Sequence, residues 1–226
     1  VQDLKQFGVD AVAQVESVLT NELTQSINQH ILGQIRAQGV KNITSTFGAA
    51  TSFDIELAAA SALAGGETVA SEHRKVLTQV LAAANLIANR GRRGAGNFAV
   101  VGAQVATVLQ SIAGFVANPM ANTISQSAGA IYPLGSVAGV NIYTDPNLEW
   151  EATTQQVLVG RKGADDEPGM KFMPYMMAES IQTISEGTMS PKIAVKSRYA
   201  LVEAGFHPET AYQKLVRETR QAKNAA

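Results

Sequence analysis

The stretch DAVAQVESVLTNELTQSINQHILGQIRAQ, from Asp10 to Gln38, is the longest uninterrupted helical pattern in the sequence. Asp10 is suited to cap the first turn, and Gly39 is suited to end the helix in a left-handed conformation. At about 1.5 Å per residue, this helix is roughly 40 Å long. Its apolar residues recur at steps of three and four, which predicts a buried stripe along one side. The stripe consists of Val12, Val15, Leu19, Leu23, Ile27, Ile31 and Ile35.

The polar side of this helix carries few charges, which leaves two interpretations open. The helix either crosses the core of a single domain, or it is a spine that carries the protein's own sheet and a neighbouring subunit. Across the chain, only 16% of the residues are charged whereas 46% are hydrophobic, so the surface must be poor in charge. Such surfaces suit extensive protein contacts.

The composition also excludes several classes of protein. The formal net charge of −1 argues against a dedicated nucleic-acid binder, which normally carries a basic excess. The chain has no cysteine, which excludes disulfides, thiolate metal sites and a cysteine nucleophile. The sequence has no apolar run long enough to cross a bilayer, and its first residues do not begin a signal peptide. The absence of an initiator methionine indicates a chain that is processed or cut from a longer one.

Beyond the long helix, the patterns predict an α+β fold rather than alternating βαβ units. We expect a second helix over 67–89, a third over 104–115, and a long uncharged loop over 114–135. Alternating or β-branched runs predict strands at 98–101, 140–143, 156–159, 172–184 and 192–202. Pro208 is suited to the first turn of a closing helix over 208–223.

The glycine-rich turn from Arg90 to Asn97 superficially resembles a phosphate-binding loop. It follows a helix and opens a strand, whereas a dinucleotide loop follows a strand and opens a helix. We therefore interpret Arg90, Arg92 and Arg93 as surface or subunit contacts, and we expect no cofactor. The three histidines are scattered, and the acidic run 165–167 is typical of a solvated turn, so no metal site is expected. The sequence shows no catalytic arrangement, and we predict that the chain is not an enzyme.

Seven stretches together resemble the major capsid proteins of tailed bacteriophages of the T-even myovirus type. They follow the order of that family over most of the chain, and they are 2–10, 18–28, 90–98, 141–143, 157–163, 172–175 and 196–199. The resemblance implies the Hong-Kong-ninety-seven capsid fold. On that basis, residues 1–43 form a peripheral domain with the spine helix, residues 44–185 form the axial domain, and residues 186–226 return to the peripheral domain and end in the C-terminal helix.

The resemblance also implies how the chain works and with what. The loop over about 114–133 is expected at the five- or six-fold axis, with Asn118, Pro119 and Asn122 as subunit contacts. The protein is then a structural subunit of the virion capsid, which assembles in the host cytoplasm into hexamers and pentamers around the DNA. Expected partners are the protein itself, the scaffold, portal and decoration proteins, and the packaged DNA bound without sequence preference; no membrane is involved.

The sequence departs from the family pattern at its ends, and it leaves alternatives open. The N-terminal arm and extended loop that precede the spine in the family are missing, which indicates a processed or truncated product. A vertex-forming paralogue and an encapsulin-like compartment shell share the fold. A small enzyme that binds a phosphorylated ligand at the 90–97 loop is the alternative from another functional class.

Overall fold

The computed structural model describes residues 11–41, 68–118, 130–150, 154–164, 166–187, 191–205 and 207–218. Its helices are α2 (Ala11–Lys41), α4 (Val69–Gly91), α5 (Ala103–Gln110) and the short 3-10 helix η2 (Pro208–Ala211). Its strands are β1 (Phe98–Val101), β2 (Val116–Ala117), β3 (Tyr132–Val137), β4 (Val140–Thr144), β5 (Thr154–Gly160), β6 (Gly169–Ile184), β7 (Pro191–Ala204) and β8 (Tyr212–Glu218). The mixture of helices and mainly antiparallel sheets confirms the predicted α+β class.

The chain forms two compact units, each made of two segments. The hairpin unit comprises Val1–Gly33 and Met170–Glu203, and the sheet unit comprises Gln34–Gly169 and Ala204–Ala226. The boundary within α2 falls between Gly33 and Gln34. These boundaries differ from the predicted ones, because β6 belongs with β7 and not with the strands that precede it. The assignment of peripheral and axial domains stays a prediction.

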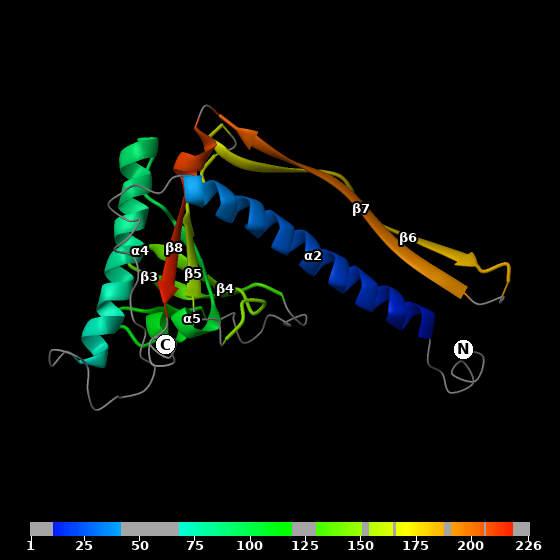
Figure 1. Ribbon diagram of the computed structural model, residues 1–226, viewed down its shortest axis with the longest axis horizontal. Helices are drawn as coiled ribbons and strands as arrows, with labels where there is room; N and C mark the ends of the chain where they lie inside the picture. Colours follow the sequence, from blue (N-terminus) through cyan, green and yellow to red (C-terminus); the bar gives the residue numbers. More distant parts are fainter. Residues whose placement is uncertain are drawn as a thin grey trace. The chain divides into compact units, whose positions relative to one another are not determined.

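The sheet unit is built on a six-stranded sheet with the order β2-β3-β4-β1-β5-β8. Strand β1 lies inside this sheet, parallel to β4 and antiparallel to β5, so that Phe98 is opposite both Asn141 and Gly160. Helix α4 packs against β5 and β8, α5 packs against β4 and β5, and the two helices contact each other (Figure 1).

The core of the sheet unit lies between these helices and the sheet. On α4, which covers most of the helix predicted over 67–89, the buried residues Val76, Val80, Ala84 and Ile87 recur at steps of three and four. They meet apolar side chains of β1, β4, β5 and α5 in one cluster. Burying each large apolar side chain contributes about 1.5–3 kcal/mol to folding, so this cluster holds the unit together.

The hairpin unit contains the long strands β6 and β7, which form a two-stranded sheet. Figure 1 shows α2 running beside them, and a 2.8 Å hydrogen bond between His30 Nδ1 and the Tyr199 hydroxyl ties the helix to β7. The alternation predicted for 192–202 is confirmed. The half-buried residues are Ile193, Val195, Ser197, Tyr199 and Leu201, and the exposed residues are Ala194, Lys196, Arg198 and Ala200.

The predicted stripe of α2 is only partly covered by the chain itself. Leu19, Leu23, Ile27, Ile31 and Ile35 are half-buried, whereas Val15 is 48% exposed. Among the side chains of α2 that the structure describes, Leu32 is the most deeply buried apolar one, and it falls outside the predicted stripe. A two-stranded sheet is narrow, and it covers only part of the surface of a helix. The predicted end at Gly39 is also wrong, because the helix continues to Lys41; Asp10 lies outside the described residues.

The predicted C-terminal helix is wrong. Pro208 opens only the four-residue η2, and residues 212–218 form β8. Strand β8 pairs with β5 in an unbroken antiparallel register from Thr154–Glu218 to Gly160–Tyr212. Seven residues of ladder pairing outweigh the weak intrinsic helix preference of this segment, because propensity is easily overridden by tertiary contacts.

The predicted helix 104–115 and the predicted loop 114–135 are both longer than the elements that the structure shows. Helix α5 ends at Gln110 rather than at 115, and a tight turn follows it. Within the predicted loop 114–133, Val116–Ala117 forms β2 and pairs with Gly135–Ser136 of β3. Residues 119–129, which include Pro119 and Asn122, lie outside the described residues.

Candidate functional site

The exposed face of the β6–β7 hairpin carries large apolar side chains. Successive side chains of a strand point to opposite faces. Phe172 of β6 lies 5.4 Å, centroid to centroid, from the half-buried ring of Tyr199, so this face is directed toward α2. On the opposite face, Glu179 of β6 pairs with Lys196 of β7 at 2.9 Å. We call this opposite face the outer hairpin face. Its exposed residues are Met173, Tyr175, Met177, Glu179, Ile181, Thr183, Lys192, Ala194, Lys196, Arg198, Ala200 and Val202.

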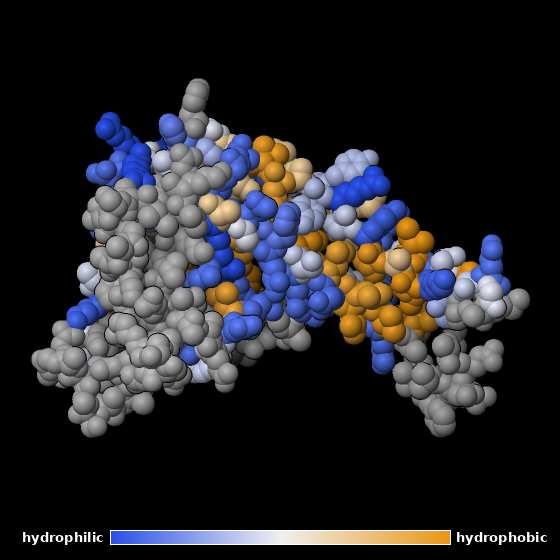
Figure 2. All heavy atoms as spheres, in the orientation of Figure 1, coloured by the Kyte–Doolittle hydropathy of each residue, from blue (hydrophilic) through white to orange (hydrophobic). Residues whose placement is uncertain are grey.

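The side chains of the outer hairpin face are unusually apolar for an exposed surface. Tyr175 is 82% exposed, Met177 67% and Met173 51%. Tyrosine, methionine and arginine are enriched in the cores of protein interfaces, whereas singly scattered exposed apolar residues are common. Figure 2 shows apolar atoms gathered over the region of α2, β6 and β7. A group of such residues on one exposed face is typical of a contact surface.

The glycine-rich turn at 90–97 is a structural junction between α4 and β1. Helix α4 ends at Gly91, and Arg92 takes the left-handed C-cap conformation, with a φ of 51°, and donates its backbone N–H to the Ala88 carbonyl. Arg93 forms a 3.6 Å ion pair with the exposed Asp166. Arg90 is half-buried, and Arg92 and Arg93 are exposed. The interpretation of these arginines as subunit contacts stays a prediction.

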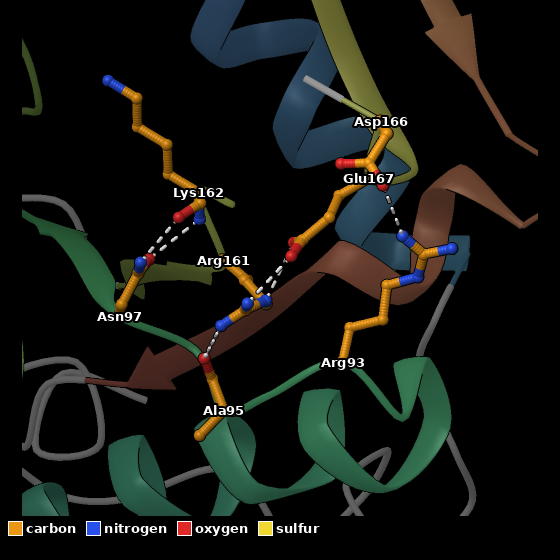
Figure 3. A network of polar contacts seen from close by, with 7 residues as sticks. All are labelled: Arg93, Ala95, Asn97, Arg161, Lys162, Asp166 and Glu167. Atoms are coloured by element: carbon orange, nitrogen blue, oxygen red, sulfur yellow. Dashed lines mark hydrogen bonds and ion pairs between the residues drawn. The ribbon is translucent and has the colours of Figure 1, made fainter. Parts of the chain in front are cut away.

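Arg161 and Glu167 form the centre of the polar network beside this turn (Figure 3). Arg161 Nε and Nη2 donate to the two oxygens of the Glu167 carboxylate, each at 2.9 Å. Arg161 Nη1 also donates to the Ala95 carbonyl at 3.3 Å. The hydrogen bonds from Arg161 hold the pKa of Glu167 below its ordinary value of 4.5, and the positive charges of Arg161 and Arg93 act in the same direction against burial and Asp166. The acidic run 165–167 predicts a solvated turn. For Glu167 this interpretation is wrong, because its carboxylate is engaged by Arg161.

Two glycines make room for this ion pair. A Cβ atom at Gly94, where φ is 134°, would lie 2.6 Å from Arg161 Nη1. A Cβ atom at Gly163 would collide with the Glu167 carboxylate. Gly94 and Gly163 thus serve the same ion pair. The charged side chains pass so close to the backbone at both positions that a larger residue would collide with them.

Asn97 joins the same two stretches through its side-chain amide. Its Nδ2 donates to the Lys162 carbonyl at 2.7 Å, and its Oδ1 accepts from the Lys162 N–H at 2.8 Å (Figure 3). The Asn97 backbone N–H donates to the Gly160 carbonyl at 2.9 Å. These bonds extend the β1–β5 pairing beyond the strand ends and fix the turn.

A second ion pair, which sequence reasoning missed, lies at the end of β4. Arg36 Nη2 donates to Asp145 Oδ2 at 3.1 Å, and the Asp145 side chain is only 2% exposed. Asp145 Oδ1 accepts the Asn147 backbone N–H at 3.1 Å, which makes a local turn. The only signal in the sequence was that Arg36 is the single Lys or Arg between Asp10 and Gly39.

The remaining sequence-predicted contact residue within the described chain is Asn118. It is half-buried and lines a shallow groove with Val116, Ser136 and Tyr143. Among the described residues, no group of three or more His, Asp and Glu side chains is arranged to hold a metal ion. Within the same residues, none of the helices combines the length and apolar character needed to span a membrane.

Comparison with known proteins gives consistent matches over the chain. The family model for "Major capsid protein Gp23" matches residues 1–226. The major capsid protein of Vibrio phage KVP40 is 26% identical over 220 residues, which cover 93% of this chain and 42% of that protein. The protein of the same name from Enterobacteria phage T4 is 26% identical over 217 residues, covering 92% and 40%, and that from Serratia phage KSP90 is 24% identical over 206 residues, covering 88% and 44%.

The chain thus spans about two fifths of the length of the curated relatives it matches. The matched family consists of structural capsid proteins of the virion and not of enzymes, so the alternative of a small phosphate-ligand enzyme is set aside. The ion pair between Arg93 and Asp166 agrees with this, because it engages one of the three arginines of the 90–97 turn. From the match over its full length, the chain belongs to the major capsid protein Gp23 family.

Proposed function

We propose that this chain acts by self-association, as a subunit of hexamers and pentamers that close into an icosahedral shell around the phage DNA. The observation that carries the proposal is the outer hairpin face, which exposes Tyr175, Met177 and Met173 in a member of a capsid protein family. Repeated burial of one complementary surface under symmetry needs no catalytic group. Such a face in a protein that worked as a monomer would be an aggregation hazard.

The proposal includes the Hong-Kong-ninety-seven capsid fold. In this assignment, α2 is the spine helix, the hairpin unit is peripheral, and the sheet unit carries the axial tip near β2 and β3. The long helix beside a long hairpin, and the separate mixed sheet with α4 and α5, support the assignment. Scaffold, portal and decoration proteins and the packaged DNA are the further partners that it implies.

The test is light scattering after size exclusion, followed by negative-stain microscopy of each peak. We expect rings, sheets or shells with five- or six-fold units. Tyr175→Ser should shift the distribution toward monomer without changing the circular dichroism spectrum, because the ring is exposed. Gln182→Ser, at an exposed position on the opposite face of the same strand, is the matched control and should behave as the wild type. A wild-type chain that stays monomeric at all accessible concentrations would contradict self-association by this chain.

A further inference from the structure

Two exposed surfaces of the hairpin unit are complementary in charge and in apolar character. The first is the outer hairpin face, defined above. The second is an exposed stripe of α2, whose members recur at steps of three and four along the helix. The exposed helix stripe consists of Val15, Val18, Glu22, Ser26, Gln29 and Gly33. It is distinct from the half-buried residues Leu19, Leu23 and Ile27 of the same helix.

The helix stripe belongs to an acidic segment. From Ala11 to Ile35, the only formally charged side chains are Glu16 and Glu22, and both are acidic. Glu22 is exposed. Beside it, Val18 is 68% exposed and Val15 is 48% exposed, so the stripe joins a negative charge to apolar surface.

The outer hairpin face has the opposite charge. Strand β7 presents Lys192, Lys196 and Arg198 on this face, all exposed. Lys196 is paired with Glu179, which is the one acidic residue that β6 places there. Within the part of the chain that the structure describes, Arg198 has no carboxylate partner. The face therefore offers unpaired positive charge beside apolar side chains.

The hairpin has one covered face and one open face. Helix α2 lies against the first, and strands β6 and β7 have no third strand beside them among the described residues. Exposed strand edges and apolar faces are normally covered in native proteins. A partner on the outer hairpin face would supply this cover.

We infer that the outer hairpin face of one copy receives the exposed helix stripe of a second copy, with Glu22 of one copy near Arg198 of the other. This inference rests on the proposed self-association, and it names the two surfaces that meet. Because the two surfaces differ, the contact is heterologous, and repeated heterologous contacts generate a ring when the rotation closes. The apolar side chains supply burial, and the charges fix which surfaces pair.

The test is charge reversal on both surfaces in the full chain, read by light scattering over a concentration series. Arg198→Glu and Glu22→Lys should each raise the concentration needed for half-association by about tenfold. The double variant Arg198→Glu with Glu22→Lys should recover most of the loss. Glu186→Lys, an exposed reversal in the turn after β6, is the control and should leave association unchanged. Circular dichroism of each variant checks that it is folded.

The outcomes separate this inference from the proposed function. Association that is unaffected by either single reversal, or not recovered in the double variant, overturns the docking of these two surfaces and leaves self-association standing. A monomeric wild type overturns both. An independent check uses the absence of cysteine from the chain. A mixture of Val18→Cys and Met177→Cys copies should form a disulfide-linked dimer of the two different copies on mild oxidation, and a failure to do so under associating conditions contradicts the inference.

Discussion

The guanidinium of Arg161 meets the carboxylate of Glu167 through two parallel hydrogen bonds, both 2.9 Å long, between the end of β5 and the start of β6. Such two-pronged pairs are stronger and more directional than neutral hydrogen bonds. Here the pair joins two residues of the connection between β5 and β6. Its contribution can be measured through its dependence on pH.

Glu167→Gln should lower stability at neutral pH, and its effect should shrink in acid. The folded-state pKa of Glu167 lies below 4.5, so the carboxylate stabilises the fold fully above the unfolded-state pKa. That stabilisation is lost as the pH falls through the lower, folded-state pKa. Urea unfolding of both proteins over a pH series should therefore show a constant gap at neutral pH that closes below about 4.5. A gap that widens in acid would contradict this sign.

Gly163→Ala should destabilise the sheet unit. The new methyl group would occupy the space of the Glu167 carboxylate and force the ion pair apart. Gly187→Ala is the matched control, because a Cβ atom at Gly187 meets nothing within 4 Å. Thermal unfolding followed by circular dichroism should give a lower midpoint for Gly163→Ala only. Equal midpoints for the two variants would show that the pair moves aside without loss.

Asp145→Asn should be far more damaging than Asp166→Asn. Asp145 is 2% exposed and faces Arg36, so its neutralisation leaves a poorly solvated guanidinium; breaking a buried pair costs about 3–5 kcal/mol. Asp166 is 79% exposed and faces Arg93, which is 49% exposed, and exposed pairs contribute about 0–1 kcal/mol. The two free energies of unfolding, measured in urea, check the ranking. Similar values would indicate that water reaches the Arg36–Asp145 pair.

Ile27→Asp should destabilise α2 against the hairpin. Ile27 is half-buried, so we expect a loss of about 1–3 kcal/mol, less than for a fully buried isoleucine. Ser17→Asp introduces the same charge at an exposed position of α2 outside the exposed helix stripe, and it should change the free energy of unfolding by about 0.5 kcal/mol or less. If both variants unfold alike, the side of α2 that faces the hairpin has been wrongly identified.

Gly33→Ala should stabilise the helix. Gly33 is an exposed interior position of α2, and a Cβ atom there meets nothing within 4 Å. Alanine is favoured over glycine in a helix interior by about 1 kcal/mol. The variant should gain helical signal and unfold at a higher urea concentration. A lower midpoint would indicate that the break in helix preference at Gly33 has a structural role.

The elements with strong periodicity could be predicted from the sequence, and those that depend on long-range pairing could not. The spacing of Val76, Val80 and Ile87 is a property of α4 alone, and so is the alternation of β7. Strand β8 forms because it pairs with β5, which lies more than fifty residues earlier in the chain, and no pattern within residues 212–218 indicates that partner. The stripe of α2 is apolar as predicted, but how deeply each residue is buried depends on the hairpin beside the helix, and no pattern within α2 indicates how much of the helix that hairpin covers.

The polar network shows the same division at the level of single residues. The 90–97 turn is unusually rich in glycine, and in this respect it resembles a phosphate-binding loop. The actual role of these glycines, clearance for Arg161 and Glu167, required knowledge that residues 94 and 163 approach the same ion pair. The Arg36–Asp145 pair left almost no trace in the sequence, because neither residue belongs to a motif.

The pairing of β5 with β8 has a consequence for how the protein tolerates change in length. Gly160 and Tyr212 are direct partners across these strands, so the chain between them leaves and re-enters the sheet at one point. The outgoing and returning segments lie close together, since a Cβ atom at Gly205 would lie 2.6 Å from Pro168 Cβ. Residues added to or removed from β6 and β7 in equal numbers should therefore change the length of the β6–β7 hairpin and leave the register between β5 and β8 intact. The length of the hairpin is thus independent of the strand pairing that holds the sheet unit together.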